Sequence, residues 1–244
     1  MMSFPGSDME SSVPRSQGLV LDRVVLLGRT MDEYRRSFGL NDGDLRGRHI
    51  LDVAAGVSSF CAEAHSSGYS VTAFDRIYQL VPGEIAARCG HDLDEVVRGM
   101  AGLTTYRWAF YQSPEKMRQF RERAYRAFLE DYPGGRGTRY VAGELPALPF
   151  EPNQFGLSLV SYLLFVYEDQ FSYEFHRDSL LELTRVTRDE VRIYPTVTFA
   201  ARRSSYLDRI RADPQLGHLE FREMPTDFEF LAGSNSYLSI RRKG

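Results

Sequence analysis

Short apolar runs alternate with amphipathic segments along this chain, and this alternation is typical of an α/β fold. The runs with the length and composition of strands are 50–53, 70–74, a segment ending near 143–144, 157–160, 191–194, 219–224 and 237–241. The helical patterns cover 19–38, 58–67, 92–100, a segment beginning at 113–114, 175–186 and 206–212. The order of these segments predicts a mostly parallel, doubly wound sheet that ends in an antiparallel hairpin.

The stretch from His49 to Asp75 reads as strand, tight turn, helix and strand. Small residues from Ala54 to Ser59 let the backbone turn, and the helix that follows directs free N–H groups and its positive dipole end at a ligand on that turn. Asp75 lies nineteen residues after Gly56, where a nucleotide-binding unit places the carboxylate that binds ribose hydroxyls. We therefore predict a cofactor site; the alternative is a βαβ unit without a ligand.

Two cofactor classes use such a unit, and their glycines differ. A dinucleotide fingerprint needs G-x-G-x-x-G, because the pyrophosphate approaches bare backbone, and the corresponding positions here are Ala54, Gly56 and Ser59. Asp52 at the strand end, followed by this single glycine, instead resembles the first motif of class I S-adenosylmethionine-dependent methyltransferases. In that family the loop holds the methionine part of the cofactor, so fewer glycines are required.

A second stretch, residues 139–167, carries the same resemblance. Methyltransferases of this class often read G-D-x-x-x-L-P-F-x-x-x-x-F-D-x-V, and this chain has Gly143, Glu144 and then Leu-Pro-Phe at 148–150. In the family the acid after strand three binds the adenine amino group, so the resemblance implies this role for Glu144. The alternative is a surface acid at a strand end. The chain departs from the pattern at Gly156, which replaces the second aspartate.

The resemblance covers about residues 19–244 and implies a seven-stranded sheet whose last strand is antiparallel. It implies S-adenosyl-L-methionine as the cofactor and methyl transfer by direct displacement as the reaction. The residues that we assign to the cofactor on this basis are Tyr34, Asp52, Ala54, Gly56, Ser58, Asp75, Arg76, Tyr78, Glu144, Leu145 and Ser161. For Tyr34 and Tyr78, ordinary packing against the sheet is an open alternative.

The segment 81–138 is long for one crossover between strands two and three and carries two helical patterns. We expect it to be a helical insertion that caps the substrate. An aromatic cluster between the two patterns includes Trp108, the only tryptophan of the chain, and forms either a wall against a substrate or the insertion's own core. We assign Tyr106, Trp108 and Tyr162 to the substrate and Phe110 to the core. Such a pocket suits a small, partly apolar acceptor.

A sulfonium cofactor already carries a good leaving group, so the resemblance implies catalysis by positioning and exclusion of water, with no obligatory base. If the acceptor has to lose a proton, the candidate residues are Tyr162, Tyr173 and His176. A structural role on its helix is the alternative for His176. The competing class of function is a protein that binds the cofactor without turnover.

Net charge and one missing motif bear on the acceptor. The 244 residues carry a formal net charge of −3, so an RNA acceptor would need a local basic patch. The basic segment 116–126 offers such a patch, and its alternative is a solvated helix face. The N-P-P-Y sequence of many nucleobase amino-methylating enzymes is absent. We therefore favour a small molecule over a nucleic acid.

Further features limit metals, processing and location. Cys61 and Cys89 are too few for a disulfide framework or a multi-cysteine zinc site, and Cys61 and His65 on one helix face lack an evident third ligand. We assign no metal and expect a cytoplasmic compartment. Residues 1–18 are rich in Ser, Pro and Gly, so we expect a disordered tail ahead of a single domain, 19–244. No apolar run is long enough to span a bilayer, so we expect a soluble protein.

Overall fold

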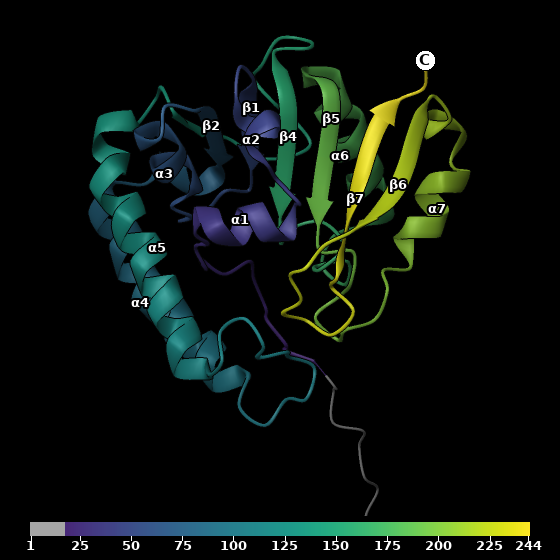
Figure 1. Ribbon diagram of the computed structural model, residues 1–244. Coiled ribbons are helices and arrows are strands. Elements are labelled where there is room, and N and C mark those ends of the chain that lie inside the picture. The colour runs from purple at the N-terminus through teal and green to yellow at the C-terminus, as the bar shows by residue number, and fades with distance from the viewer. Residues whose placement is uncertain (1–17) are drawn as a thin grey trace, which may run out of the picture.

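A seven-stranded sheet in the order β3-β2-β1-β4-β5-β7-β6 forms the centre of the computed structural model, which describes residues 18–244 (Figure 1). The strands are β1 His49–Val53, β2 Ser70–Asp75, β3 Tyr140–Ala142, β4 Phe155–Ser161, β5 Thr187–Tyr194, β6 Leu219–Pro225 and β7 Ser236–Arg242. Strands β1 to β5 pair in parallel, whereas β7 is antiparallel to both β5 and β6. The predicted fold class is confirmed. The expected disordered tail lies, apart from Gly18, outside the described residues.

The helices cover the two faces of this sheet and its β3 side (Figure 1). They are α1 Met31–Ser37, α2 Asp42–Leu45, α3 Phe60–Ser66, α4 Pro82–Gly99, α5 Pro114–Gly135, α6 Tyr173–Val186 and α7 Tyr206–Ala212, with short 3₁₀ helices η1 Arg76–Gln79 and η2 Pro214–Leu216. None of the helices within residues 18–244 has both the length and the apolar composition that a membrane crossing requires.

Each face of the sheet has its own hydrophobic core, because successive side chains of a strand point to opposite faces. In β1, Ile50 packs in the core beneath α1 and α3, and Leu51 packs in the core beneath α6. Asp52 is fully buried on the same face as Ile50. The alternation therefore turns one carboxylate toward α1, directly before the turn that ends the strand.

Helices α4 and α5 form the insertion between β2 and β3 that the sequence predicted. Helix α4 is longer than the predicted 92–100, because Pro82 occupies its first turn and the helix runs on from there. Helix α5 begins as predicted, with Ser113 as its N-cap accepting from the backbone N–H of Lys116. The two helices lie side by side and extend past the carboxyl ends of the strands, and the loop that joins them lies on that side of the sheet (Figure 1).

The predicted helix over 19–38 is wrong in its first half, since α1 begins only at Met31. Thr30 caps α1 in a reciprocal capping box with Glu33, which fixes the start of the helix. A side chain at Gly28 would lie 2.1 Å from the carbonyl oxygen of Val57, so the chain passes too close to the turn after β1 for anything but glycine. Residues 19–29, called the N-terminal strap below, therefore run as irregular chain.

Candidate functional site

The turn after β1 is held in shape by the carboxylate that ends β2. Ala54 and Gly56 both have left-handed backbone, with φ of 55° and 54°. The Asp75 carboxylate accepts from the backbone N–H of Gly56 at 2.9 Å through Oδ2 and from that of Ile77 at 2.9 Å through Oδ1. Asp75 therefore ties the turn to the end of the neighbouring strand. Burial raises its pKa above the usual value, and these two hydrogen bonds oppose the rise.

A second set of residues supports the turn from beneath. The Tyr34 hydroxyl donates to Asp52 at 3.0 Å, and the Tyr34 ring stacks on Phe60 with centroids 4.4 Å apart. The Ser58 hydroxyl accepts from the backbone N–H of Arg29 at 3.1 Å. These contacts are those expected if Tyr34 packs against the sheet and does not contact the cofactor, which was the alternative for this residue.

Tyr78 lies on the other side of the turn. Its hydroxyl donates to the carbonyl oxygen of Gly56 at 2.8 Å, and its ring packs on Phe128 of the insertion. Tyr34, Asp52, Ser58 and Tyr78 thus shape the turn without lining either of the two pockets described below.

Replacing Asp52 with asparagine should stabilise the protein at about pH 8 more than at about pH 4. Burial raises the pKa of Asp52 well above its usual range and the charge of Asp75 adds to this, whereas the hydrogen bond from Tyr34 and the charge of Arg29 oppose it. The folded state therefore keeps the proton to higher pH than the unfolded chain, and stability falls as pH rises through that window. Asparagine cannot ionise. Urea unfolding at the two pH values tests this, and an equal change at both would contradict it.

The strand-end pocket opens at the carboxyl ends of β1, β2 and β3 and has a volume of about 120 Å³. Its lining residues are Val24, Val53, Ala54, Phe74, Asp75, Arg76, Gly143, Glu144, Leu145, Leu163, Phe171 and Phe175. The pocket brings together Ala54, Asp75, Arg76, Glu144 and Leu145 of the residues predicted to bind the cofactor. Three stretches far apart in the sequence thus converge on one cavity.

The polar rim of the strand-end pocket is open to solvent. Arg76 and Glu144 are 3.7 Å apart with side chains 75% and 68% exposed, so their ion pair contributes little to stability. Both side chains therefore remain available to a ligand. Sequence reasoning missed Phe171 and Phe175, whose rings stack 4.5 Å apart beside the pocket, because they lie ahead of and within α6 and belong to no motif.

A second cavity, the apolar pocket, has a volume of about 40 Å³. Its lining residues are Leu19, Leu21, Val25, Leu27, Arg29, Val96, Met100, Tyr106, Tyr162, Tyr167, Phe199, Phe230 and Leu231. Tyr106 and Tyr162, both predicted to contact substrate, lie here together. Trp108 does not line this pocket; its ring packs edge-on against Phe230 with centroids 5.6 Å apart. Phe110 packs against Tyr111 at 4.8 Å.

The two pockets lie on either side of the residues that follow β4. Tyr162 lines the apolar pocket and Leu163, the next residue, lines the strand-end pocket. In the N-terminal strap, Val24 lines the strand-end pocket and Val25, the next residue, lines the apolar pocket. Tyr162 has φ of 52°, an uncommon conformation for a bulky residue and one that clusters at functional sites. The residues that follow β4 and part of the N-terminal strap thus contribute to both pockets.

The other candidates for catalysis lie away from both pockets. His176 accepts from the backbone N–H of Phe165 at 3.2 Å through Nε2, so its Nδ1 carries the proton and donates to the carbonyl oxygen of Ser172 at 2.8 Å. Burial lowers its pKa. Tyr173 donates to Asp213 at 2.6 Å, toward α7.

Ser161, which was predicted to bind the cofactor, is buried and lines neither pocket, and its hydroxyl has no hydrogen-bond partner among residues 18–244.

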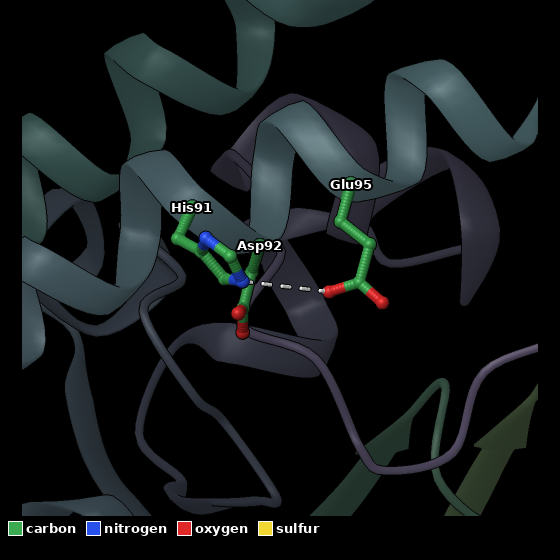
Figure 2. A group of neighbouring side chains, drawn as sticks. All are labelled: His91, Asp92 and Glu95. Carbon is green, nitrogen blue, oxygen red and sulfur yellow. Dashed lines mark ion pairs between the residues drawn. The ribbon is translucent and has the colours of Figure 1, made fainter.

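Three side chains of α4, His91, Asp92 and Glu95, bring possible metal-ligand atoms within 4.8 Å of one another (Figure 2). The Arg23 guanidinium already lies 2.9 Å from Asp92 and 2.8 Å from Glu95. Asp92 also accepts from the backbone N–H of Leu26 at 2.8 Å. Because their charge is engaged by Arg23, these acids fasten the N-terminal strap to α4, and we assign no metal to them.

Three of the five basic residues of α5 pair with acids. Arg118 forms ion pairs with Asp94 of α4 and with Glu122, and Arg126 lies 3.8 Å from Glu122. Arg121 is not a surface residue at all, because it is only 2% exposed. The patch that the sequence offered to a polyanion is therefore smaller than the count of arginines indicates.

The strand order, the antiparallel β7 and a site at the carboxyl ends of β1 and β2 define the class I S-adenosylmethionine-dependent methyltransferase fold, as the sequence predicted. The chain belongs to the family of the uncharacterized protein MJ0045 of Methanocaldococcus jannaschii. The two are 39% identical over 226 residues, which cover 92% of this chain and 99% of the relative. No model of a known protein family matches the chain.

Solved structures with a similar fold include a putative S-adenosyl-L-methionine-dependent methyltransferase of Methanococcus maripaludis. It is 13% identical, with a TM-score of 0.40 and coverage of 87% of this chain and 83% of that one. Magnesium protoporphyrin IX methyltransferase of Synechocystis PCC 6803 is 12% identical, with a TM-score of 0.45 and coverage of 87% and 90%. At these identities the two structures resemble this chain in fold only.

Proposed function

We propose that this protein transfers a methyl group from S-adenosyl-L-methionine to a small, partly apolar acceptor by direct displacement. The observation that carries the proposal is the meeting of Ala54, Asp75 and Glu144 in one strand-end pocket, beside a separate apolar pocket. The first pocket suits the adenosine part of the cofactor and the second suits the acceptor. A fold with this strand order agrees with such a division.

The residues of the strand-end pocket fit an adenosine group. Val53, Phe74 and Leu145 provide apolar surface for a planar base. Asp75 and Glu144 provide carboxylates for ribose hydroxyls and for an exocyclic amino group. Gly143 keeps the cavity open, because a side chain there would lie 2.5 Å from the Phe74 ring.

The bound cofactor would supply a sulfonium, which is a good leaving group, so this chain's part is to orient the acceptor and exclude water. The apolar pocket is lined by carbon-rich side chains from the N-terminal strap, from α4 and from the loop before Trp108. Val96, Met100 and Tyr106 belong to the insertion, which supports a capping role for residues 81–138. We propose that the described chain from residue 19 onward works as one domain.

Titration calorimetry of the purified protein with S-adenosyl-L-methionine, with its demethylated product and with NAD tests the cofactor. We expect both sulfur compounds to bind and NAD not to bind, since the turn lacks the glycines that a pyrophosphate needs. Binding of NAD alone would contradict the proposal.

A second experiment tests turnover and acceptor class, because a protein that only binds the cofactor would pass the first. Labelled S-adenosyl-L-methionine is incubated with fractionated small molecules and, separately, with total RNA from cell extract. We expect label in a small-molecule fraction. Label in RNA together with salt-sensitive retention on heparin would contradict a small acceptor, and no transfer to any fraction would favour the binding protein.

A further inference from the structure

Arg29 is a buried cation whose charge interacts with the buried carboxyl group of Asp52 without forming an ion pair with it. It is 9% exposed, and no carboxylate among the described residues lies within ion-pair distance of it. The other buried arginines differ, since Arg121 pairs with Glu33 at 2.5 Å and Arg192 pairs with Asp44 at 2.8 Å. Buried charges are normally paired, because removing an ion from water is costly. An arginine left unpaired in the lining of a cavity points to an anion that binds there.

The hydrogen bonds of Arg29 leave part of its guanidinium unused. One terminal nitrogen donates to the carbonyl oxygen of Leu27 at 3.1 Å, but Nε has no partner among residues 18–244. The guanidinium lies over the Tyr162 ring, with 3.4 Å from its carbon to the ring centroid. This cation–π contact holds the guanidinium against the Tyr162 ring in the lining of the apolar pocket.

Tyr162 supplies a second unused donor. The residue is 8% exposed, and no atom within residues 18–244 meets hydrogen-bond geometry with its hydroxyl, although the Tyr194 hydroxyl is near enough to lower its pKa. Burial raises the pKa of this phenol, and the positive charges of Arg29 and Arg121 counteract the rise only in part. The phenol is therefore protonated at neutral pH, so it can donate a hydrogen bond to a ligand and does not act as a base.

The rest of the apolar pocket is carbon-rich, so a ligand that satisfies Arg29 and Tyr162 has an anionic group at one end and an apolar body. A groove of about 240 Å³ adjoins the pocket and shares Leu19, Leu21, Tyr167 and Phe199 with it. The apolar pocket alone, at about 40 Å³, is too small for a phenyl ring, so the apolar body would extend past these shared residues into the groove. A carboxylate suits the arginine fork because its two oxygens match two N–H donors.

We propose that the acceptor is an apolar carboxylic acid, held in the apolar pocket by its carboxylate on Arg29 and Tyr162. That this acid is the methyl acceptor rests on the proposed function, whereas the carboxylate site does not. The cofactor's own carboxylate is the other source of this chemistry, and the experiments below separate the two.

The first experiment compares acids with matched neutral molecules on the unmodified protein. Benzoate and 3-phenylpropanoate are titrated by calorimetry against benzamide and 3-phenylpropanamide, with and without the demethylated cofactor. We expect each acid to bind at least about tenfold more tightly than its amide, since a charged hydrogen bond is lost in the amide. Equal affinities, or no binding of either acid, would overturn the proposal.

The second experiment assigns the site with three variants. Arg29→Met should remove the preference for acids, Arg29→Lys should retain part of it, and Tyr162→Phe should weaken acid binding while leaving the fold unchanged, since only an unpaired hydroxyl is removed. Thermal unfolding of each variant identifies any that is misfolded, and Tyr162→Phe then carries the test. An unchanged acid preference in a folded Arg29→Met and in Tyr162→Phe would overturn the proposal.

The third experiment separates acceptor from cofactor. Demethylated cofactor and methylthioadenosine, which lacks the amino-acid part, are titrated into Arg29→Met. Weaker binding of the first compound alone would place Arg29 on the cofactor's carboxylate and overturn the acceptor assignment. Unchanged binding of both supports it. If neither nucleoside binds the unmodified protein but the acids do, the proposed methyl transfer fails and the carboxylate site stands.

Discussion

Replacing Arg121 with methionine is expected to destabilise the protein by about 3–5 kcal/mol, because it leaves a buried carboxylate without its counter-charge. Glu33 is 0% exposed and Arg121 is 2% exposed, and their side chains are 2.5 Å apart. Arg121 also donates to the carbonyl oxygen of Gly28 at 3.0 Å, and Tyr111 donates to Glu33. The ion pair therefore joins α1, α5 and the end of the N-terminal strap.

The pH dependence of this effect follows from the pKa of Glu33. Burial raises that pKa, but the Arg121 charge and the hydrogen bonds from Thr30 and Tyr111 bring it below the usual value. The stabilisation is therefore complete above the pKa of the unfolded chain and is lost as pH falls through the folded pKa. The difference between the unmodified protein and Arg121→Met should shrink on acidification.

Urea unfolding at neutral pH and at about pH 3 measures both effects. Arg123→Met on the same helix is the matched control, since Arg123 is exposed and its loss should cost less than about 0.5 kcal/mol. Adding Glu33→Gln to Arg121→Met should restore part of the stability by removing the stranded charge. A loss below about 1 kcal/mol in Arg121→Met would mean that the pair contributes no more than a surface ion pair does.

Replacing Asp75 with alanine is expected to weaken binding of S-adenosyl-L-methionine by about 1–3 kcal/mol, which is about fivefold to about 150-fold. Two causes act together. The proposed ribose contact is lost, and the N–H groups of Gly56 and Ile77, each 2.9 Å from the carboxylate, lose their acceptor. The turn that should hold the methionine part of the cofactor then has less to keep it in place.

Calorimetry with the cofactor and its demethylated product measures the loss, and thermal unfolding shows whether the fold is kept. Glu144→Ala is the matched control, because Glu144 lines the same pocket but its side chain is 68% exposed and its ion pair with Arg76 is weak. We expect the control to lose less affinity than Asp75→Ala. Unchanged cofactor binding in a folded Asp75→Ala would contradict the assignment of this residue.

Much of the fold was predictable because its signals are local. The strand, turn and helix of 49–75 lie within a span that a single βαβ unit covers, and the small residues after the first strand predict the turn. The start of α5 follows from Ser113 and Pro114, which satisfy the first turn by themselves. Parallel strands end at one edge of a sheet, so the convergence of Asp75 and Glu144 also followed from their positions after strands.

The N-terminal strap shows where such reasoning stops. Its apolar residues recur at spacings that suit a helix, yet they are divided between two pockets and α4. What prevents a helix is the close approach of Gly28 to Val57 and the pairing of Arg23 with Asp92. Those partners are distant in the sequence, so periodicity alone could not reveal them.

The sequence by itself determined the order of strands and helices, the turn at Gly56 and the acids at the strand ends, because each depends on neighbouring residues. The tertiary structure alone decided which arginines are buried and which of them are paired. Arg121 looks like one more basic residue of a solvated helix, and its partner Glu33 lies 88 residues away. The environment of Arg29 likewise depends on the packing of the strap against the end of β4, since burial and charge pairing are properties of the assembled chain.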